Sequence, residues 1–287
     1  YNPYGGQSLY DFNSIGGLRS HRVSMDRPFG EAFTTVFDNW AQHLVRWMAK
    51  NGLAADFCTD VDIVANPAIL NPYQLCVSAG HDEYWTLGRR NTMDAFVARG
   101  GNMAIFGANT SWFQCRLEAG KGVPNRTVVC YKDAAADPVV DPTLKTINFV
   151  NLTPPNPENK TTGLSYLTGC SWTSALPRPA TPWTLMREEH WSMAGTGLGR
   201  GAAFGAAYVG YECDAAMFRL GAGDGRPHPT ATDGSPATLR ILALADGSNW
   251  NALSLAQGGA GEQSGYAMIA LFSRGNGGGT VFNAGVV

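Results

Sequence analysis

Apolar side chains recur at helical spacing in the first part of the chain. From Glu31 to Asn51 they follow one another at steps of three and four residues, the pattern of one face of an α-helix. Lys50 lies in the last turn of this segment and Gly52 comes just after it, which is typical of a helix C-terminus. The pattern therefore predicts a helix that ends near Asn51.

Short apolar runs then alternate with a second helical segment. Ala55–Val61 and Gln74–Ala79 have the length of strands. Thr86 is placed to cap a helix that Gly100-Gly101 would end, and Met103–Phe106 is another apolar run. Strand, helix and strand with short connections favour a parallel sheet with helices on its faces.

Prolines interrupt the chain over residues 132–210, where no helical period is visible. We expect this stretch to form an irregular, β-rich insertion. Three apolar runs that could complete the same sheet follow it, at Leu239–Ala245, Ala267–Phe272 and Thr280–Phe282. A Gly-rich turn, Gly275–Gly279, joins the last two. The sequence thus predicts a single α/β domain over residues 1–287 with the insertion inside it.

Charge and cysteine content exclude some classes of partner. The net charge is −2, so the chain has no basic surface for nucleic acid or anionic lipid. No apolar stretch approaches the roughly 20 residues that cross a bilayer. The six cysteines are widely spaced without a C-x-x-C pair, which favours buried free thiols over disulfides or a metal cluster, and with them a cytoplasmic location.

Candidate chemistry follows two of the predicted strands. Gln74–Ala79 leads into a loop with an imidazole, two carboxylates, a phenol and an indole in consecutive positions: His81, Asp82, Glu83, Tyr84 and Trp85. Met103–Phe106 leads into Gly107-Ala108-Asn109. In parallel sheets ligands bind beyond the carboxyl ends of the strands, so both loops would open at one edge. Function is favoured over a purely structural role for the first loop.

The second loop lacks a nucleophile. In hydrolases and glutamine amidotransferases, a strand, a sharp turn and a helix present a Ser or Cys at the turn. Here that position is Asn109, and Ser111 lies two residues further on without a G-x-S-x-G frame. Covalent catalysis at this turn is therefore disfavoured. Asn109 could orient a substrate through its amide, or bond only to the turn backbone.

A third candidate is the segment 210–214, in which Glu212 and Asp214 flank Cys213. The segment follows an apolar run that has strand length. Its structural interpretation is a strand end with surface carboxylates, and its functional interpretation is a carboxylate of the site. No zinc-type spacing, phosphate-binding loop or dinucleotide fingerprint occurs in the chain.

These blocks resemble the C-terminal domain of the large (β) subunit of N,N-dimethylformamidase and its relatives. The resemblance spans nearly the whole chain and is most specific in Gly80-His81-Asp82-Glu83-Tyr84-Trp85 and Phe106-Gly107-Ala108-Asn109. It extends to Val23-Ser24-Met25-Asp26-Arg27-Pro28, Gly210-Tyr211-Glu212-Cys213-Asp214 and Val281-Phe282-Asn283-Ala284-Gly285. It implies an α/β fold similar to class I glutamine amidotransferases and flavodoxin-like proteins, with a mostly parallel sheet flanked by helices and no nucleophile at the turn.

The resemblance also implies a metal. The formamidase holds one ferric iron with two tyrosines and a glutamate, and it hydrolyses a small tertiary amide. Its motif tyrosine matches Tyr84, and Tyr10 and Tyr4 are candidates for the second. Its glutamate aligns near Thr161–Leu164, where this chain has no acid. Ferric iron would suit phenolate and carboxylate ligands and lower the pKa of bound water.

The expected function is therefore metal-assisted hydrolysis of a C–N bond in a small amide. Glu83 or Glu212 would act as general base toward water, and His81 would donate to the oxyanion or the leaving amine. One alternative is a non-catalytic domain that binds a ligand or carbohydrate through exposed Trp85, Trp112 and Tyr211. Another is a structural subunit, so an additional subunit or a homo-oligomer is an expected assembly.

Overall fold

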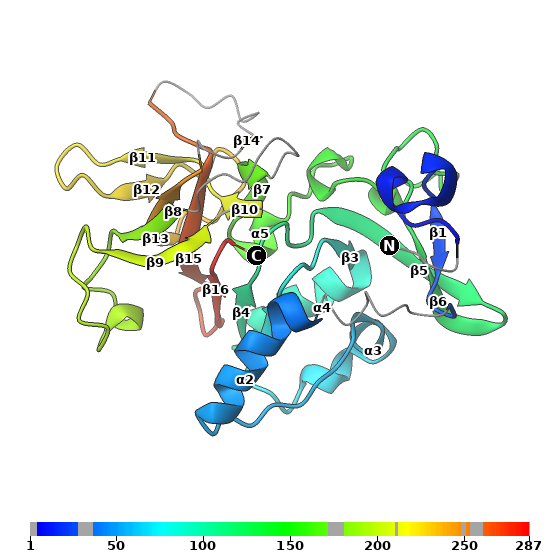
Figure 1. The fold of residues 1–287 in the computed structure, drawn as a ribbon, viewed down its shortest axis with the longest axis horizontal. Coiled ribbons are helices and arrows are strands. Elements are labelled where there is room, and N and C mark those ends of the chain that lie inside the picture. Colours follow the sequence, from blue (N-terminus) through cyan, green and yellow to red (C-terminus); the bar gives the residue numbers. More distant parts are fainter. Residues whose placement is uncertain are drawn as a thin grey trace. The chain divides into compact units, whose positions relative to one another are not determined.

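The computed structural model describes residues 5–27, 37–171, 181–209, 212–247, 251–252 and 261–286. The chain forms two compact units, each assembled from several segments (Figure 1). Unit 1 comprises residues 1–72, 84–93 and 111–156, and unit 2 comprises 73–83, 94–110 and 157–287. A single domain over 1–287, with 132–210 as an insertion, stays a prediction.

Unit 1 contains a four-stranded sheet in the order β1-β6-β5-β3. The strands are β1 (Arg22–Ser24), β3 (Tyr84–Thr86), β5 (Phe113–Gly120) and β6 (Val123–Val129). β5 and β6 form an antiparallel hairpin, β1 adds to it antiparallel, and β3 pairs with β5 in parallel. The helical elements are η1 (Asp11–Asn13), η2 (Ile15–Gly17), the π-helical η4 (Phe37–Ala41), α2 (Gln42–Lys50), α3 (Asp60–Ala65), η5 (Pro67–Leu70), η6 (Pro142–Leu144) and η7 (Phe149–Asn151).

Unit 2 is built on a seven-stranded sheet in the order β2-β4-β16-β15-β13-β8-β9. These strands are β2 (Leu75–Ala79), β4 (Asn102–Phe106), β8 (Thr181–Leu185), β9 (Ala203–Val209), β13 (Arg240–Asp246), β15 (Tyr266–Ser273) and β16 (Thr280–Asn283). Two smaller sheets contain β7 (Ser165–Ser171), β10 (Glu212–Ala215) and β14 (Asn251–Ala252), and β11 (Phe218–Leu220) with β12 (Pro227–Pro229). The helices are α5 (Asn159–Thr162) and η8 (Trp191–Met193), while α4 (Leu87–Ala98) passes from unit 1 to unit 2 after Met93.

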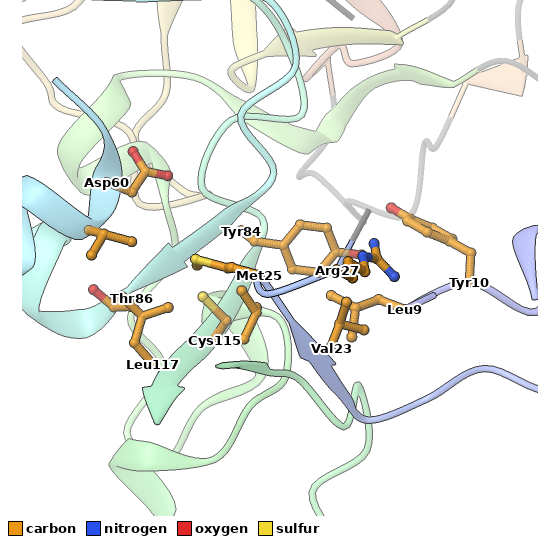
Figure 2. Close-up of a pocket in the computed structure, with 12 residues that line it drawn as sticks. Leu9, Tyr10, Val23, Met25, Arg27, Asp60, Tyr84, Thr86, Cys115 and Leu117 are labelled. Atoms are coloured by element: carbon orange, nitrogen blue, oxygen red, sulfur yellow. The ribbon is translucent and has the colours of Figure 1, made fainter. Parts of the chain in front are cut away.

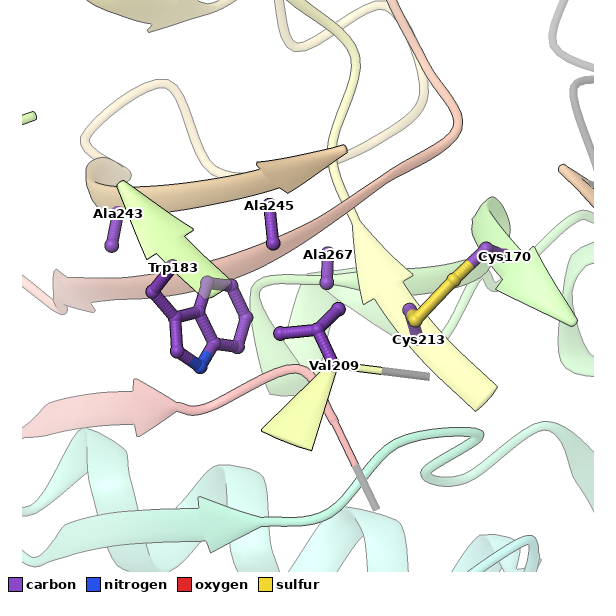
Figure 3. Packing of buried hydrophobic residues seen from close by; sticks show 7 residues of the cluster. All are labelled: Cys170, Trp183, Val209, Cys213, Ala243, Ala245 and Ala267. Carbon is purple, nitrogen blue, oxygen red and sulfur yellow. A yellow bond between two sulfur atoms is a disulfide. The ribbon is translucent and has the colours of Figure 1, made fainter. Parts of the chain in front are cut away.

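The core of unit 2 combines one large aromatic side chain with small ones. The inner strand β13 is buried at five consecutive positions between exposed ends, as expected for a strand covered on both faces. Trp183 packs with Val209 against small residues of the neighbouring strands, namely Ala243, Ala245 and Ala267 (Figure 3). Small side chains next to a large one allow the layers to interdigitate at close packing.

The expectation of a mostly parallel α/β sheet, similar to glutamine amidotransferases, is wrong. Parallel pairing in the large sheet is confined to β2, β4 and β16, and its other pairs are antiparallel. The unit β2–α4–β4 does form as strand, helix and parallel strand. After β4, however, the chain enters the β5–β6 hairpin instead of a second helix. Among the later strands of the large sheet, only β16 pairs in parallel with β4, and β8, β9, β13 and β15 are joined to their neighbours by antiparallel pairing.

Most of the local predictions hold. The predicted helix ends at Lys50, and its part before Phe37 lies outside the described residues. The hydroxyl of Thr86 caps α4 by accepting the Arg89 amide at 2.9 Å. The strand expected at Ala55–Val61 is wrong, because Thr59 and Asp62 form a capping box that starts α3. The remaining apolar runs form β2, β4, β13, β15 and β16.

One disulfide corrects the expectation of six free thiols. Cys170 on β7 and Cys213 on β10 lie directly opposite each other and are bonded. The other four cysteines form no disulfide: Cys58, Cys76, Cys115 and Cys130. Spacing could not reveal the pair, because β7 and β10 become neighbours only when the sheet forms.

We expect denatured, unreduced protein to titrate four thiols with a chromogenic thiol reagent, and reduced protein to titrate six. The bond closes a loop of 43 residues, so its loss should lower the free energy of unfolding by about 2–4 kcal/mol. Denaturant titration of Cys170→Ser measures that loss, with Cys58→Ser as the control. Six reactive thiols before reduction would contradict the disulfide.

Candidate functional site

An imidazole and a carboxylate meet in unit 2. His81 follows β2 and Gly80, and Glu212 is the first residue of β10. His81 Nε2 lies 2.5 Å from Glu212 Oε2, and both side chains are largely buried. A buried carboxylate at this distance fixes the orientation of the ring and favours its protonated form.

The turn after β4 reaches the same carboxylate. Asn109 Nδ2 donates to Glu212 Oε1 at 3.2 Å, and Tyr166 Oη donates to the same oxygen at 3.3 Å. Burial, followed by the charge of Glu212, raises the pKa of Tyr166, so its phenol stays a proton donor. Glu212 is thus surrounded by three polar side chains from three separate segments.

The loops that carry His81 and Asn109 meet through glycine. The amide of Gly80 donates to the Phe106 carbonyl at 2.8 Å, which joins the ends of β2 and β4. A Cβ atom at Gly107 would lie 2.3 Å from the Gly80 carbonyl oxygen. Only glycine permits this approach, which brings the two loops together.

A second carboxylate holds the turn itself. Asp214 Oδ1 accepts the Asn109 amide at 2.7 Å, and its Oδ2 accepts the Thr110 amide at 3.4 Å. Asn109 has a φ of 51°, in the left-handed region that Asn tolerates better than most residues. Asp214 is completely buried. Burial raises its pKa to about 8, against the effect of the Asn109 amide and with the help of the charge of Glu158.

Three polar atoms of the turn after β4 have no hydrogen-bond partner among the described residues. They are Asn109 Oδ1, Thr110 Oγ1 and Ser111 Oγ, and all are buried; Asn109 and Thr110 belong to unit 2. A buried polar atom without a partner costs about 1–3 kcal/mol, and such atoms are usually satisfied by water or a ligand. The turn therefore offers an acceptor and a hydroxyl to a molecule bound there.

The charge balance around His81 favours its imidazolium form. Burial alone lowers the pKa of His81, but the hydrogen bond and charge of Glu212 raise it, and Glu83 and Asp214 add to this effect. The net result is a pKa above the ordinary value. Glu83 is itself buried, and the neighbouring Asp82 accepts the Ser78 hydroxyl at 2.6 Å. His81 is therefore suited to donate a proton near neutral pH.

The whole chain matches one known protein family. A family model described as N,N-dimethylformamidase beta subunit-like, C-terminal, matches residues 1–287. The chain belongs to this family. No match to a curated protein was found. The helices that the structure describes include none long and apolar enough to cross a membrane.

The tyrosines that the formamidase resemblance assigns to iron lie in unit 1. The rings of Tyr10 and Tyr84 pack edge to face with centroids 6.3 Å apart, and both line one pocket (Figure 2). The Lys132 ammonium lies 3.6 Å from the Tyr10 centroid and 5.1 Å from that of Tyr84. Asp60 is the acid that lines this pocket among the described residues. Its carboxylate pairs with the Arg89 guanidinium at 2.8 Å.

This donor set does not fit the iron that the formamidase family implies. A hard cation would face the Lys132 charge and would lack a carboxylate that is not already paired. The described part of the chain also contains no cluster of three His, Cys, Asp or Glu that could hold a metal. Tyr4, the other candidate, lies outside the described residues.

The aromatic residues proposed for a binding domain are not a shared exposed surface. Trp85 is 1% exposed, and the Arg89 guanidinium lies 3.9 Å from its ring centroid. Trp112 is partly buried, and Tyr211 lies outside the described residues. The alternative that relied on an exposed Trp85 is therefore wrong on that point.

At the level of sequence, Asp214 was named only as part of the candidate segment 210–214, without its role in holding the turn, and Tyr166 was missed. Asp214 had a usable signal, because residues 212 and 214 of one strand point to the same face. Tyr166 had none, since only the pairing of β7 with β10 brings it to Glu212.

The raised pKa of Asp214 predicts a pH-dependent stability. Because the folded-state pKa exceeds that of the unfolded chain, this contribution is complete below about pH 4 and is lost as the pH rises through about 8. The unfolding free energy should therefore fall, relative to Asp214→Asn, by up to about 1.4 kcal/mol per pH unit. Urea titrations between about pH 5 and pH 9 measure the difference.

His81 is present in both proteins, but the charge of Asp214 contributes to its raised pKa, so the difference between the two profiles reports Asp214 together with its effect on His81. Asp141→Asn is the matched control, because hydrogen bonds from Thr143 lower the pKa of Asp141, which therefore does not titrate in this range. Parallel pH profiles for the unaltered protein and Asp214→Asn would contradict the prediction.

The poor fit of the two tyrosines to iron gives another expected result. Tyr84→Phe and Tyr10→Phe should each have the same iron content and visible spectrum as the unaltered protein, since neither phenol would be a ligand. Elemental analysis and absorption spectra of the folded proteins test this. Loss of iron, or of a phenolate charge-transfer band, in either variant would contradict it.

Proposed function

We propose that this chain hydrolyses the C–N bond of a small amide at the cluster around His81 and Glu212. The observation that carries the proposal is the buried contact of 2.5 Å between their side chains, joined by Asn109, in a chain of the N,N-dimethylformamidase beta subunit-like family. The amide of Asn109 is not a nucleophile, so we assign the attack on the carbonyl carbon to water.

His81 is the general acid in this proposal. Its pKa is raised by the carboxylates around it, so the ring carries the proton that a departing amine needs. An amide nitrogen is a poor leaving group until it is protonated. Proton donation to this nitrogen is thus the contribution we assign to His81.

Glu212 positions His81, and Glu83 is the general base. Glu212 faces His81 with one oxygen and accepts Asn109 and Tyr166 with the other. A carboxylate engaged on both oxygens is better suited to hold a ring than to take up a proton. Glu83 is buried, and its charge acts on His81, so it is the carboxylate we assign to the attacking water.

The proposed reaction balances without a further reagent. Glu83 takes one proton from water as the oxygen adds to the carbonyl carbon. The C–N bond then breaks, its electron pair stays on nitrogen, and His81 supplies the proton that nitrogen requires. The products are a carboxylic acid and an amine, and proton exchange with solvent water returns Glu83 to its carboxylate and His81 to its imidazolium. Asn109 Oδ1 accepts a hydrogen bond from the attacking water or from a substrate N–H.

None of these steps uses iron, because Tyr10 and Tyr84 do not fit it. The family description names a beta subunit, and we propose that the chain also assembles with another subunit or with a second copy of itself.

Three variants test the roles, with N,N-dimethylformamide and a panel of small primary and secondary amides as probes. We expect His81→Gln and Glu83→Gln to reduce kcat by about 10²–10⁴, because each removes a proton-transfer group. Glu212→Gln should reduce kcat less and lower the pKa of the alkaline limb of the pH–rate profile, since His81, the general acid, loses the carboxylate that raises its pKa. Released amine is measured on preparations whose melting temperatures are known.

His228→Gln is the matched control. His228 also pairs with a carboxylate, Asp224, at 3.0 Å, but it is exposed. This variant should retain full turnover. Absence of amide hydrolysis by the unaltered protein across the panel, or full kcat in folded His81→Gln, would refute the proposal.

A further inference from the structure

A pocket lies on one face of the sheet in unit 1. Val23 on β1 lies opposite Val128 on β6, which in turn lies opposite Leu117 on β5. Cys115 lies two residues before Leu117, on the same face of β5, and opposite Thr86 on β3. These side chains line a pocket of about 360 Å³. Figure 2 shows side chains from several strands gathered around it.

The lining is suited to an apolar molecule. Besides the floor residues, Leu9, Met25 and Val61 contribute aliphatic or thioether surface, and Tyr10 and Tyr84 contribute rings. Water in such a space finds few hydrogen-bond partners, and an apolar cavity of roughly 150 Å³ already holds a benzene ring. A pocket of about 360 Å³ therefore has room for a body of two fused rings or a branched alkyl chain.

The charges around the pocket favour an anionic end on that molecule. Arg27 lines the pocket and is exposed, and among the described residues it donates one hydrogen bond, to the Gln7 carbonyl at 3.2 Å. Its guanidinium has further N–H donors in a fork that matches a carboxylate. Lys132 adds a second cation next to Tyr10. The negative charge of Asp60 would oppose an anionic ligand, but this carboxylate is already paired with the Arg89 guanidinium.

We propose that this pocket binds a small apolar carboxylate. The ring or alkyl body lies on the floor formed by Val23, Leu117 and Val128, and the carboxylate bonds to Arg27. The proposal does not rest on amide hydrolysis, because all of these residues belong to unit 1 and none belongs to the cluster around His81.

The proposal is tested by calorimetric titration with 2-naphthoate and with the neutral 2-naphthamide. The two ligands share the apolar ring body, so the difference between them reports the carboxylate. The unaltered protein should bind naphthoate at one saturable site, and more tightly than naphthamide. Leu117→Phe and Val128→Phe fill the floor from two different strands, so each should weaken naphthoate binding about tenfold or more. Val140→Phe adds the same ring at a residue that is 91% exposed and should change nothing.

Arg27→Gln tests the carboxylate. It should weaken naphthoate binding about fivefold, as expected for one exposed ion pair, and leave naphthamide binding unchanged. Arg46→Gln, an exposed arginine on α2 that does not line the pocket, is the control. Circular dichroism confirms that each variant is folded. Absence of saturable naphthoate binding, binding that both filling variants leave intact, or equal affinities for the acid and the amide would overturn the proposal.

Discussion

The arrangement of unit 2 depends on the bond between the Asp214 carboxylate and the backbone of the turn after β4. Burying a carboxyl group costs several kcal/mol unless hydrogen bonds replace water. Here the amides of Asn109 and Thr110 replace it, and the Asp214 amide itself donates to the Gly285 carbonyl at 3.0 Å. One residue of β10 thereby ties the small sheet to the ends of β4 and β16 in the large sheet.

The same strand presents the catalytic carboxylate that we propose. Along a strand, alternate side chains point to opposite faces, so Glu212 and Asp214 share one face and Cys213 points to the other. The disulfide from Cys213 to Cys170 holds β10 on β7 at the residue between the two acids. Three consecutive residues therefore fix the strand on both sides, which limits how far Glu212 can move from His81.

Local elements of the fold could be predicted, but their pairing could not. Periodicity identified β2, α4, β4 and the three C-terminal strands, because burial of one face or of a whole strand leaves a direct pattern in the residues. The direction of pairing depends on the connections. The five-residue turn Gly275–Gly279 already required β15 and β16 to be antiparallel, and treating them as part of a parallel sheet neglected this constraint. At Ala55–Val61, the Thr59 capping box prevailed over strand propensity.

In the candidate site too, residues next to a strand could be predicted, but contacts between distant segments could not. His81, Glu83 and Asn109 could be predicted because they come directly after strands whose ends share an edge, and the close approach of Gly80 and Gly107 makes that edge a single site. Tyr84 was grouped with His81 because it is close in sequence. The chain nevertheless passes from unit 2 to unit 1 between Glu83 and Tyr84, and Tyr84 packs with Tyr10 and Phe113. A consecutive motif thus contains residues with two different environments. A buried charge such as His81 needs a charged or hydrogen-bonding partner, whereas the ring of Tyr84 needs other rings to pack against. The role of each residue in such a motif must therefore be assigned from the contacts that it makes.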